Sequence, residues 1–97
     1  MQKSLIEKLS TKNILIIDDD QEVSAETVEY LTDSGFTVDA AHDGPSGVAM
    51  SGKKTYAAIL LDAKLPGLDG IAALRLIIKN NPSGKIILIS GNHDLEQ

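Results

Sequence analysis

Short aliphatic runs that alternate with helical patterns constrain the fold of this chain more than any other feature. Residues 14–17, 57–61 and 86–89 are continuous runs of Ile, Leu and Ala, each bounded by polar residues. Such runs are typical of strands that are buried on both faces of a sheet. Residues 36–40 alternate apolar and polar side chains instead, which is typical of a half-exposed strand. We therefore expect three inner strands and one edge strand.

Helical patterns occupy the segments between these runs. Asp20 is a typical N-cap for a helix over residues 21–34, and residues 44–51 and 68–80 form two further helical candidates. The apolar positions that we expect to face the sheet are Ala25, Val28, Leu31, Ile71, Leu74, Ile77 and Ile78. Strands that alternate with crossover helices predict an α/β fold, a doubly wound parallel sheet with helices on both faces.

Composition narrows the class of protein. The chain has 97 residues, enough for one domain with one hydrophobic core. It contains no cysteine, and no apolar run approaches the length of a membrane span, so we expect a cytoplasmic protein without a membrane anchor. Its net charge of −5 disfavours direct nucleic-acid binding, because that requires a basic surface.

Polar residues follow each of the three inner strands. Asp18 and Asp19 come after the first, Asp62 after the second and Ser90 after the third. The carboxyl ends of parallel strands meet at one edge of a sheet, where such folds bind their ligands. Two carboxylates about 4 Å apart repel by roughly 4 kcal/mol at an effective dielectric near 20, and a hard cation such as Mg²⁺ offsets this repulsion. Asp62 could serve both as a metal ligand and as a nucleophile.

Three stretches carry a resemblance to a known family. ILIIDDD at residues 14–20, LLDAKLPGLDG at residues 60–70 and ILIS at residues 87–90 resemble the signature segments of the response-regulator receiver domain of two-component signalling. The resemblance implies a flavodoxin-like sheet with strand order 2-1-3-4. It also divides the chain into an N-terminal extension, residues 1–12, and a receiver domain, residues 13–97.

The resemblance assigns a role to each residue of the expected site. Asp62 matches the aspartate that takes a phosphoryl group from a sensor histidine kinase or a phosphotransfer protein. Asp18 and Asp19 match the acidic pair that binds Mg²⁺ together with Asp62, and the backbone carbonyl of Lys64 matches the remaining protein ligand. Ser90 matches the switch hydroxyl that binds the phosphoryl group. A receiver of this kind is a phosphoacceptor in signalling and not an enzyme.

The sequence departs from the family pattern after Ser90. The family carries a fifth strand and two more helices there, with a lysine that pairs with the phosphoryl group, whereas this sequence ends at Gln97. We therefore expect the fifth strand and the last two helices to be absent. Residues 86–89 would then form an uncovered apolar edge, and such an edge favours pairing with another chain. A homodimer or an exchange of elements that completes the sheet is the expected consequence.

Two other functions remain open on the sequence. One is a phosphorylation-dead receiver that acts only as a protein-interaction module. The other is a phosphohydrolase similar to the haloacid dehalogenases, because Asp18 and Asp20 form an Asp-x-Asp pair after a strand. Glu22 stands against the phosphohydrolase, since that family's motif carries Thr or Val at this place.

The remaining candidate residues are assigned no function. His42 and His93 lack a partner motif and are expected at the surface. Lys53 and Lys54 are expected to form a solvated helix end.

Overall fold

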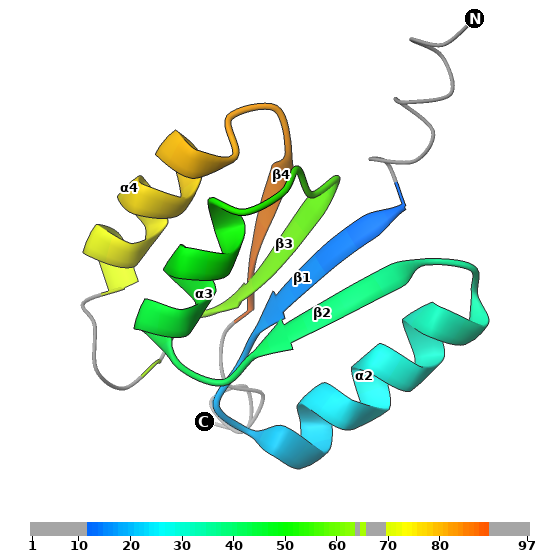
Figure 1. Ribbon diagram of the computed structural model, residues 1–97. Coiled ribbons are helices and arrows are strands. Elements are labelled where there is room, and N and C mark those ends of the chain that lie inside the picture. The colour runs from blue at the N-terminus through cyan, green and yellow to red at the C-terminus, as the bar shows by residue number, and fades with distance from the viewer. Residues whose placement is uncertain (1–11, 64, 66–69, 90–97) are drawn as a thin grey trace, which may run out of the picture.

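A parallel sheet with helices on both faces forms the part of the chain that the computed structural model describes, namely residues 12–63, 65 and 70–89 (Figure 1). The strand order is β2-β1-β3-β4, and every strand pair is parallel. The elements are β1 (Asn13–Ile17), α2 (Gln21–Asp33), β2 (Thr37–Ala41), α3 (Gly44–Ser51), β3 (Ala58–Asp62), α4 (Gly70–Asn80) and β4 (Lys85–Ile89). This architecture confirms the doubly wound α/β fold that the sequence predicts and the strand order that the family resemblance implies.

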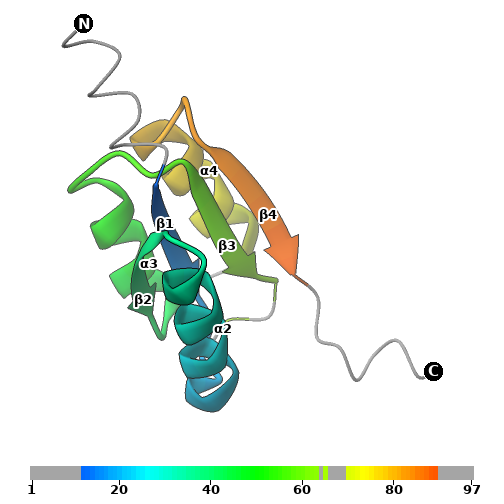
Figure 2. The same ribbon diagram turned by 90° about the vertical axis from the view of Figure 1, so that its right-hand side faces the viewer.

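The helices are divided unequally between the two faces of the sheet. Helix α2 packs over β2 on one face, whereas α3 and α4 lie side by side on the other (Figures 1 and 2). The main core lies under α3 and α4, where Leu15, Ile17, Ile59, Leu61 and Ile77 are fully buried. Burying each of these side chains contributes roughly 1.5–3 kcal/mol. The core is mainly aliphatic, and the Tyr56 ring is also buried in it.

Helix α2 turns a different stripe toward the sheet from the one expected. The sequence predicts that Ala25 faces the sheet, but Ala25 is exposed and Ser24 is buried in its place. Val28 and Leu31 are half-buried, as their spacing predicts. Apolar spacing therefore predicts the helical period correctly. The predicted buried face differs from the observed one by one residue position at the start of the helix.

Helix α4 shows the same kind of difference. Ile77 is buried as expected, and it shares its stripe with Ala73, one helical turn earlier. Ile71 and Ile78 were expected on the buried face, but they are 64% and 49% exposed. The helix has more large apolar residues than one buried stripe accommodates, so hydrophobicity alone does not identify the contact face.

Within the described residues, β2 and β4 are the two edge strands of the sheet. The expectation that β2 lies at an edge is confirmed. The prediction from the apolar run that residues 86–89 are buried on both faces is wrong, because Ile87, Leu88 and Ile89 are between 42% and 55% exposed. The expectation that they form an uncovered apolar edge is confirmed within the described residues. Figure 2 shows β4 on the side of β3 away from β1, at the other edge. The described elements leave this strand largely uncovered.

Local signals fix where α2 and α3 begin. The Asp20 carboxylate accepts hydrogen bonds from the backbone N–H groups of Glu22 and Val23, both at 3.1 Å. Asp43 accepts one from Ser46 N–H at 2.7 Å. Each cap satisfies amide groups that have no partner within the helix. The predicted cap at Asp20 is confirmed, and it holds the chain in a fixed path just after β1.

Candidate metal centre

The pairing of β1 with β3 builds a cluster of three carboxylates at one edge of the sheet. Ile17 is in register with Leu61, so the residues that follow them, Asp18 and Asp62, lie next to one another. Asp18, Asp19 and Asp62 each offer a carboxylate oxygen, and these oxygens all lie within 4.8 Å of one another. The cluster lies at the carboxyl ends of the strands, where the sequence predicts a site. Sheet register therefore determines the geometry of the cluster.

Backbone contacts hold the first of these carboxylates in place. Asp18 N–H donates to the carbonyl oxygen of Ala41 at 3.0 Å, which ties the end of β1 to the end of β2. The carboxylate of Asp18 accepts a hydrogen bond from Asp20 N–H at 2.9 Å. The Nδ1 atom of His42 lies 3.2 Å from the Asp18 carbonyl oxygen. The loop from β1 to α2 is therefore fixed on both sides of Asp19.

The donor set of the cluster fits a hard divalent cation. Asp18 and Asp62 are half-buried, whereas Asp19 is exposed. Partial burial strengthens the repulsion between carboxylates, and a cation held among their oxygens would relieve it. Mg²⁺ is bound in proteins through a few carboxylate oxygens together with water and phosphate oxygens. Asp18, Asp19 and Asp62 could hold such an ion and leave it open to a phosphate ligand.

The other two residues predicted for the site are outside the described residues. The structure gives no geometry for Lys64, whose backbone carbonyl is the predicted fourth protein ligand, or for Ser90, the predicted switch hydroxyl. Asp20 is confirmed as a helix cap, which separates its role from that of its two acidic neighbours. His42 is exposed, as expected, although its contact with Asp18 was not foreseen.

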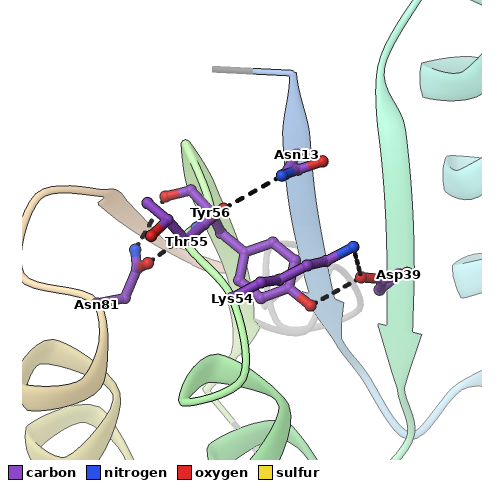
Figure 3. A network of polar contacts seen from close by, with 6 residues as sticks. All are labelled: Asn13, Asp39, Lys54, Thr55, Tyr56 and Asn81. Atoms are coloured by element: carbon purple, nitrogen blue, oxygen red, sulfur yellow. Dashed lines mark hydrogen bonds and ion pairs between the residues drawn. The ribbon is translucent and has the colours of Figure 1, made fainter. Parts of the chain in front are cut away.

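A polar network at the opposite end of the sheet was missed by the sequence analysis (Figure 3). Lys54 was expected to be a solvated helix end, but its Nζ lies 2.8 Å from the Asp39 carboxylate and 5.6 Å from the centre of the Tyr56 ring. The Tyr56 hydroxyl donates to the same carboxylate at 2.7 Å. The bond from Lys54 lowers the pKa of Asp39, while burial and the Asp39 carboxylate raise the pKa of Tyr56. The network joins β2 to the chain entering β3.

Comparison with known proteins assigns this fold to a family. A model of the response regulator receiver domain matches residues 14–97. The chain belongs to the response regulator receiver domain family. The match extends across the sheet and all three acidic residues of the cluster. No helix in the described part of this receiver domain is long and apolar enough to cross a bilayer.

Individual relatives agree with this assignment. The transcriptional regulatory protein HprR of Escherichia coli strain K12 is 38% identical over 64 residues, which are 66% of the receiver chain and 29% of HprR. The regulatory protein VanRc of Enterococcus gallinarum is 29% identical over 87 residues, 90% of the chain and 38% of VanRc. The chain thus spans only 29% and 38% of the length of these two curated relatives.

Solved structures resemble the receiver chain over most of its length. The CheY-like receiver domain protein of Methanospirillum hungatei is 33% identical, has a TM-score of 0.80, and covers 90% of this chain and 70% of its own. The response regulator TrrA of Thermotoga maritima is 27% identical, with a TM-score of 0.75 and coverage of 90% and 76%. The TrrA structure is a complex with Mg²⁺ and beryllofluoride.

Proposed function

We propose that this receiver domain accepts a phosphoryl group on Asp62 in a Mg²⁺-dependent reaction, from a phosphohistidine on a sensor histidine kinase or a phosphotransfer protein. The observation that supports this most directly is the set of three carboxylates within 4.8 Å at the carboxyl edge of a receiver sheet. A relative with the same fold, TrrA, binds Mg²⁺ together with beryllofluoride. A signalling protein that accepts one phosphoryl group per site is not expected to turn over substrates as an enzyme.

The chemistry requires Asp62 to act as a nucleophile. One of its carboxylate oxygens forms a bond to the phosphorus, and the P–N bond to the donor imidazole breaks. The electron pair of that bond stays on the imidazole nitrogen, which then takes up a proton. A bound Mg²⁺ would neutralise part of the negative charge on the phosphoryl oxygens in the transition state.

The neighbouring residues position the metal and the phosphoryl group. Asp18 and Asp19 are the proposed metal ligands beside Asp62, and the Asp20 N–H keeps the Asp18 carboxylate oriented. The backbone carbonyl of Lys64 is proposed as a further metal ligand. The hydroxyl of Ser90 is proposed to donate a hydrogen bond to a phosphoryl oxygen.

Phosphorylation with a small donor tests the proposal without a cognate kinase. The chain is incubated with acetyl phosphate and Mg²⁺, and the intact mass is measured for the added phosphoryl group. We expect the adduct in the wild-type chain and its loss in Asp62→Asn or after chelation of Mg²⁺. Asp33→Asn is the matched control, because Asp33 is an exposed acid at the end of α2, remote from the cluster. This control should be phosphorylated like the wild type.

Beryllofluoride distinguishes an active receiver from an interaction module. In the presence of Mg²⁺ it should shift the amide resonances of residues around Asp62 and Asp18. A folded chain that gives neither these shifts nor the phosphorylated mass would contradict the proposal. That result would favour a phosphorylation-dead receiver that only binds partners.

We also propose that β4 pairs with a second copy of the chain. Ile87, Leu88 and Ile89 leave this edge apolar and exposed within the described residues, and an apolar edge strand is a template for pairing. Light scattering should give a mass that rises with concentration toward that of a dimer. A monomer mass across a wide concentration range would contradict this pairing.

A further inference from the structure

A groove of about 380 Å³ lies between α2 and β2, on the face of the sheet opposite α3 and α4. It takes no part in the proposed phosphoryl transfer, and none of the three clustered carboxylates lines it. The groove is more open than enclosed, so a bound molecule would stay partly in contact with solvent. The residues that line it are Gln21, Ser24, Ala25, Val28, Glu29, Ala40 and His42.

Within the part of the chain that the structure describes, one polar group in this lining lacks a hydrogen-bond partner. Ser24 is 1% exposed, and its buried Oγ atom makes no hydrogen bond to any described residue. Buried side-chain hydroxyls are nearly always hydrogen-bonded, because an unpaired one has lost its water without compensation. Rotation of the Ser24 side chain toward the groove would let this hydroxyl hydrogen-bond to a molecule bound there. The groove therefore combines a concave surface with an unused hydrogen-bonding group.

The remaining lining indicates what kind of molecule would fit. Ala25, Val28 and Ala40 offer an apolar surface, and Glu29 places a carboxylate beside it. Helix α2 contains no Lys or Arg, and its other acids include Glu22 and Glu26. No basic side chain of the helix therefore competes for Glu29. A cation is favoured over an anion, and a compact apolar body is favoured over a sugar or a phosphate.

We propose that the groove between α2 and β2 binds a small organic amine, with its apolar body against Ala25, Val28 and Ala40 and its ammonium group toward Glu29. The hydroxyl of Ser24 hydrogen-bonds to the bound molecule. His42 lines the groove and also contacts the Asp18 carbonyl oxygen. An occupant would therefore contact a residue, His42, that itself contacts the loop carrying two of the proposed metal ligands.

Benzylamine is a suitable probe, because it joins a compact ring to a protonated amine. The full chain is titrated with it by NMR without Mg²⁺, so that the result does not depend on phosphorylation. We expect saturable shifts at the amides of Ala25, Val28 and Ala40, with a dissociation constant of roughly millimolar magnitude for so small a ligand. Benzyl alcohol should bind more weakly and benzoate should not saturate. The absence of saturable shifts at these three residues would overturn the proposal.

Two acids on the same helix provide a matched pair of variants. Glu29→Gln should raise the benzylamine dissociation constant by about twofold to fivefold, the effect of losing one exposed ion pair. Glu26→Gln makes the same change outside the groove and should leave the constant unaltered. Equal weakening by both variants would indicate general attraction to an acidic surface and would overturn the site.

Two further variants test the hydroxyl and the shape of the groove. Ser24→Ala should keep the fold and weaken benzylamine binding, because the bound amine loses a partner. Ala25→Leu should fill the groove from an exposed position and abolish the saturable shifts. Unchanged binding in a folded Ala25→Leu chain would place the probe elsewhere and overturn the proposal.

Discussion

The side-chain amide of Asn81 makes two hydrogen bonds to the backbone of Tyr56. Its Oδ1 accepts from the Tyr56 N–H at 2.9 Å, and its Nδ2 donates to the Tyr56 carbonyl oxygen at 3.0 Å (Figure 3). Asn81 directly follows α4, and it is almost completely buried. The side chain thus takes the place of a neighbouring strand and joins the end of α4 to the chain entering β3.

Asn81→Ala should therefore destabilise the fold. The variant leaves a buried N–H and a buried carbonyl without partners, at a cost of roughly 1–3 kcal/mol in the free energy of unfolding. Urea denaturation followed by circular dichroism measures this difference. Lys79→Ala is the control, because Lys79 is exposed on the same helix. Equal stability of the Asn81→Ala and wild-type chains would mean that water replaces both bonds at no cost.

The bond from Tyr56 to Asp39 should stabilise the protein in a pH-dependent way. The pKa of Tyr56 is raised above its ordinary value of 10.0, first by burial and then by the Asp39 carboxylate. A raised pKa means that the unfolded state loses its proton first, so the stabilisation is complete below pH 10 and declines as the pH rises above it. Tyr56→Phe should cost about 1–2 kcal/mol at neutral pH. The difference in the free energy of unfolding between this variant and the wild type should shrink above pH 10.

Denaturation at a series of pH values measures this effect. Tyr30→Phe is the matched control, because the Tyr30 side chain is 72% exposed. This control should match the wild type at neutral pH. A Tyr56→Phe chain whose deficit is the same at neutral and alkaline pH would show that the hydroxyl contributes through packing alone.

Gly47→Ala should destabilise the contact between α3 and β1. A Cβ atom at Gly47 would lie 2.5 Å from the Cδ1 atom of Ile17 and 2.8 Å from its Cγ2. Ile17 is fully buried in the core and has little room to move. Overpacking of this kind typically costs about 1–3 kcal/mol, which thermal denaturation detects as a lower Tm.

Gly52→Ala is the comparison for this variant. A Cβ atom there would make only ordinary contacts, the nearest at 3.4 Å, and the backbone φ of Gly52 is −92°. Its effect should be smaller than that of Gly47→Ala. The reverse order would mean that α3 can move away from β1 without loss.

Mg²⁺ should stabilise the folded chain, and removing one clustered carboxylate should make this stabilisation smaller. When the Mg²⁺ concentration is ten times the dissociation constant, binding to the folded state alone adds about 1.4 kcal/mol to the free energy of unfolding. Asp19→Asn relieves repulsion within the cluster, so without metal it should melt at a higher temperature than the wild type. With Mg²⁺ it should gain less than the wild type does.

Thermal denaturation with Mg²⁺ and with a chelator measures both effects. Asp33→Asn removes one acid outside the cluster and should respond to Mg²⁺ as the wild type does. If Asp19→Asn gains as much from Mg²⁺ as the wild type, Asp19 does not contribute to the metal site.

The sheet and the acidic edge were predictable because they depend on local sequence. Continuous apolar runs and their polar ends identify the strands, and strand ends place Asp18 and Asp62 together once the sheet is parallel. The faces of the helices were harder to predict. Ser24 and Ala25 are adjacent, and only packing against β2 decides which of them is buried.

Long-range polar contacts were not predictable at all. Lys and Asp are common on protein surfaces, and no spacing rule in the sequence pairs Lys54 with Asp39. Asn81 stands in a segment with Pro82 and Gly84 that predicts a turn, which hides its role as a partner of Tyr56. Such contacts arise from the folded geometry and leave no periodic signal.

The ion pair of Asp39 also has a consequence for aggregation. Asp39 is in register with Leu15, so its carboxylate points toward the α3 and α4 side of an edge strand, where Lys54 holds it. An inward-pointing charge on an edge strand discourages a second chain from adding to that edge. Apolar Ile87 and Leu88 give the described part of β4 no such protection. Self-association of this chain should therefore stop at two chains joined at their β4 edges, because the β2 edges do not accept a further chain.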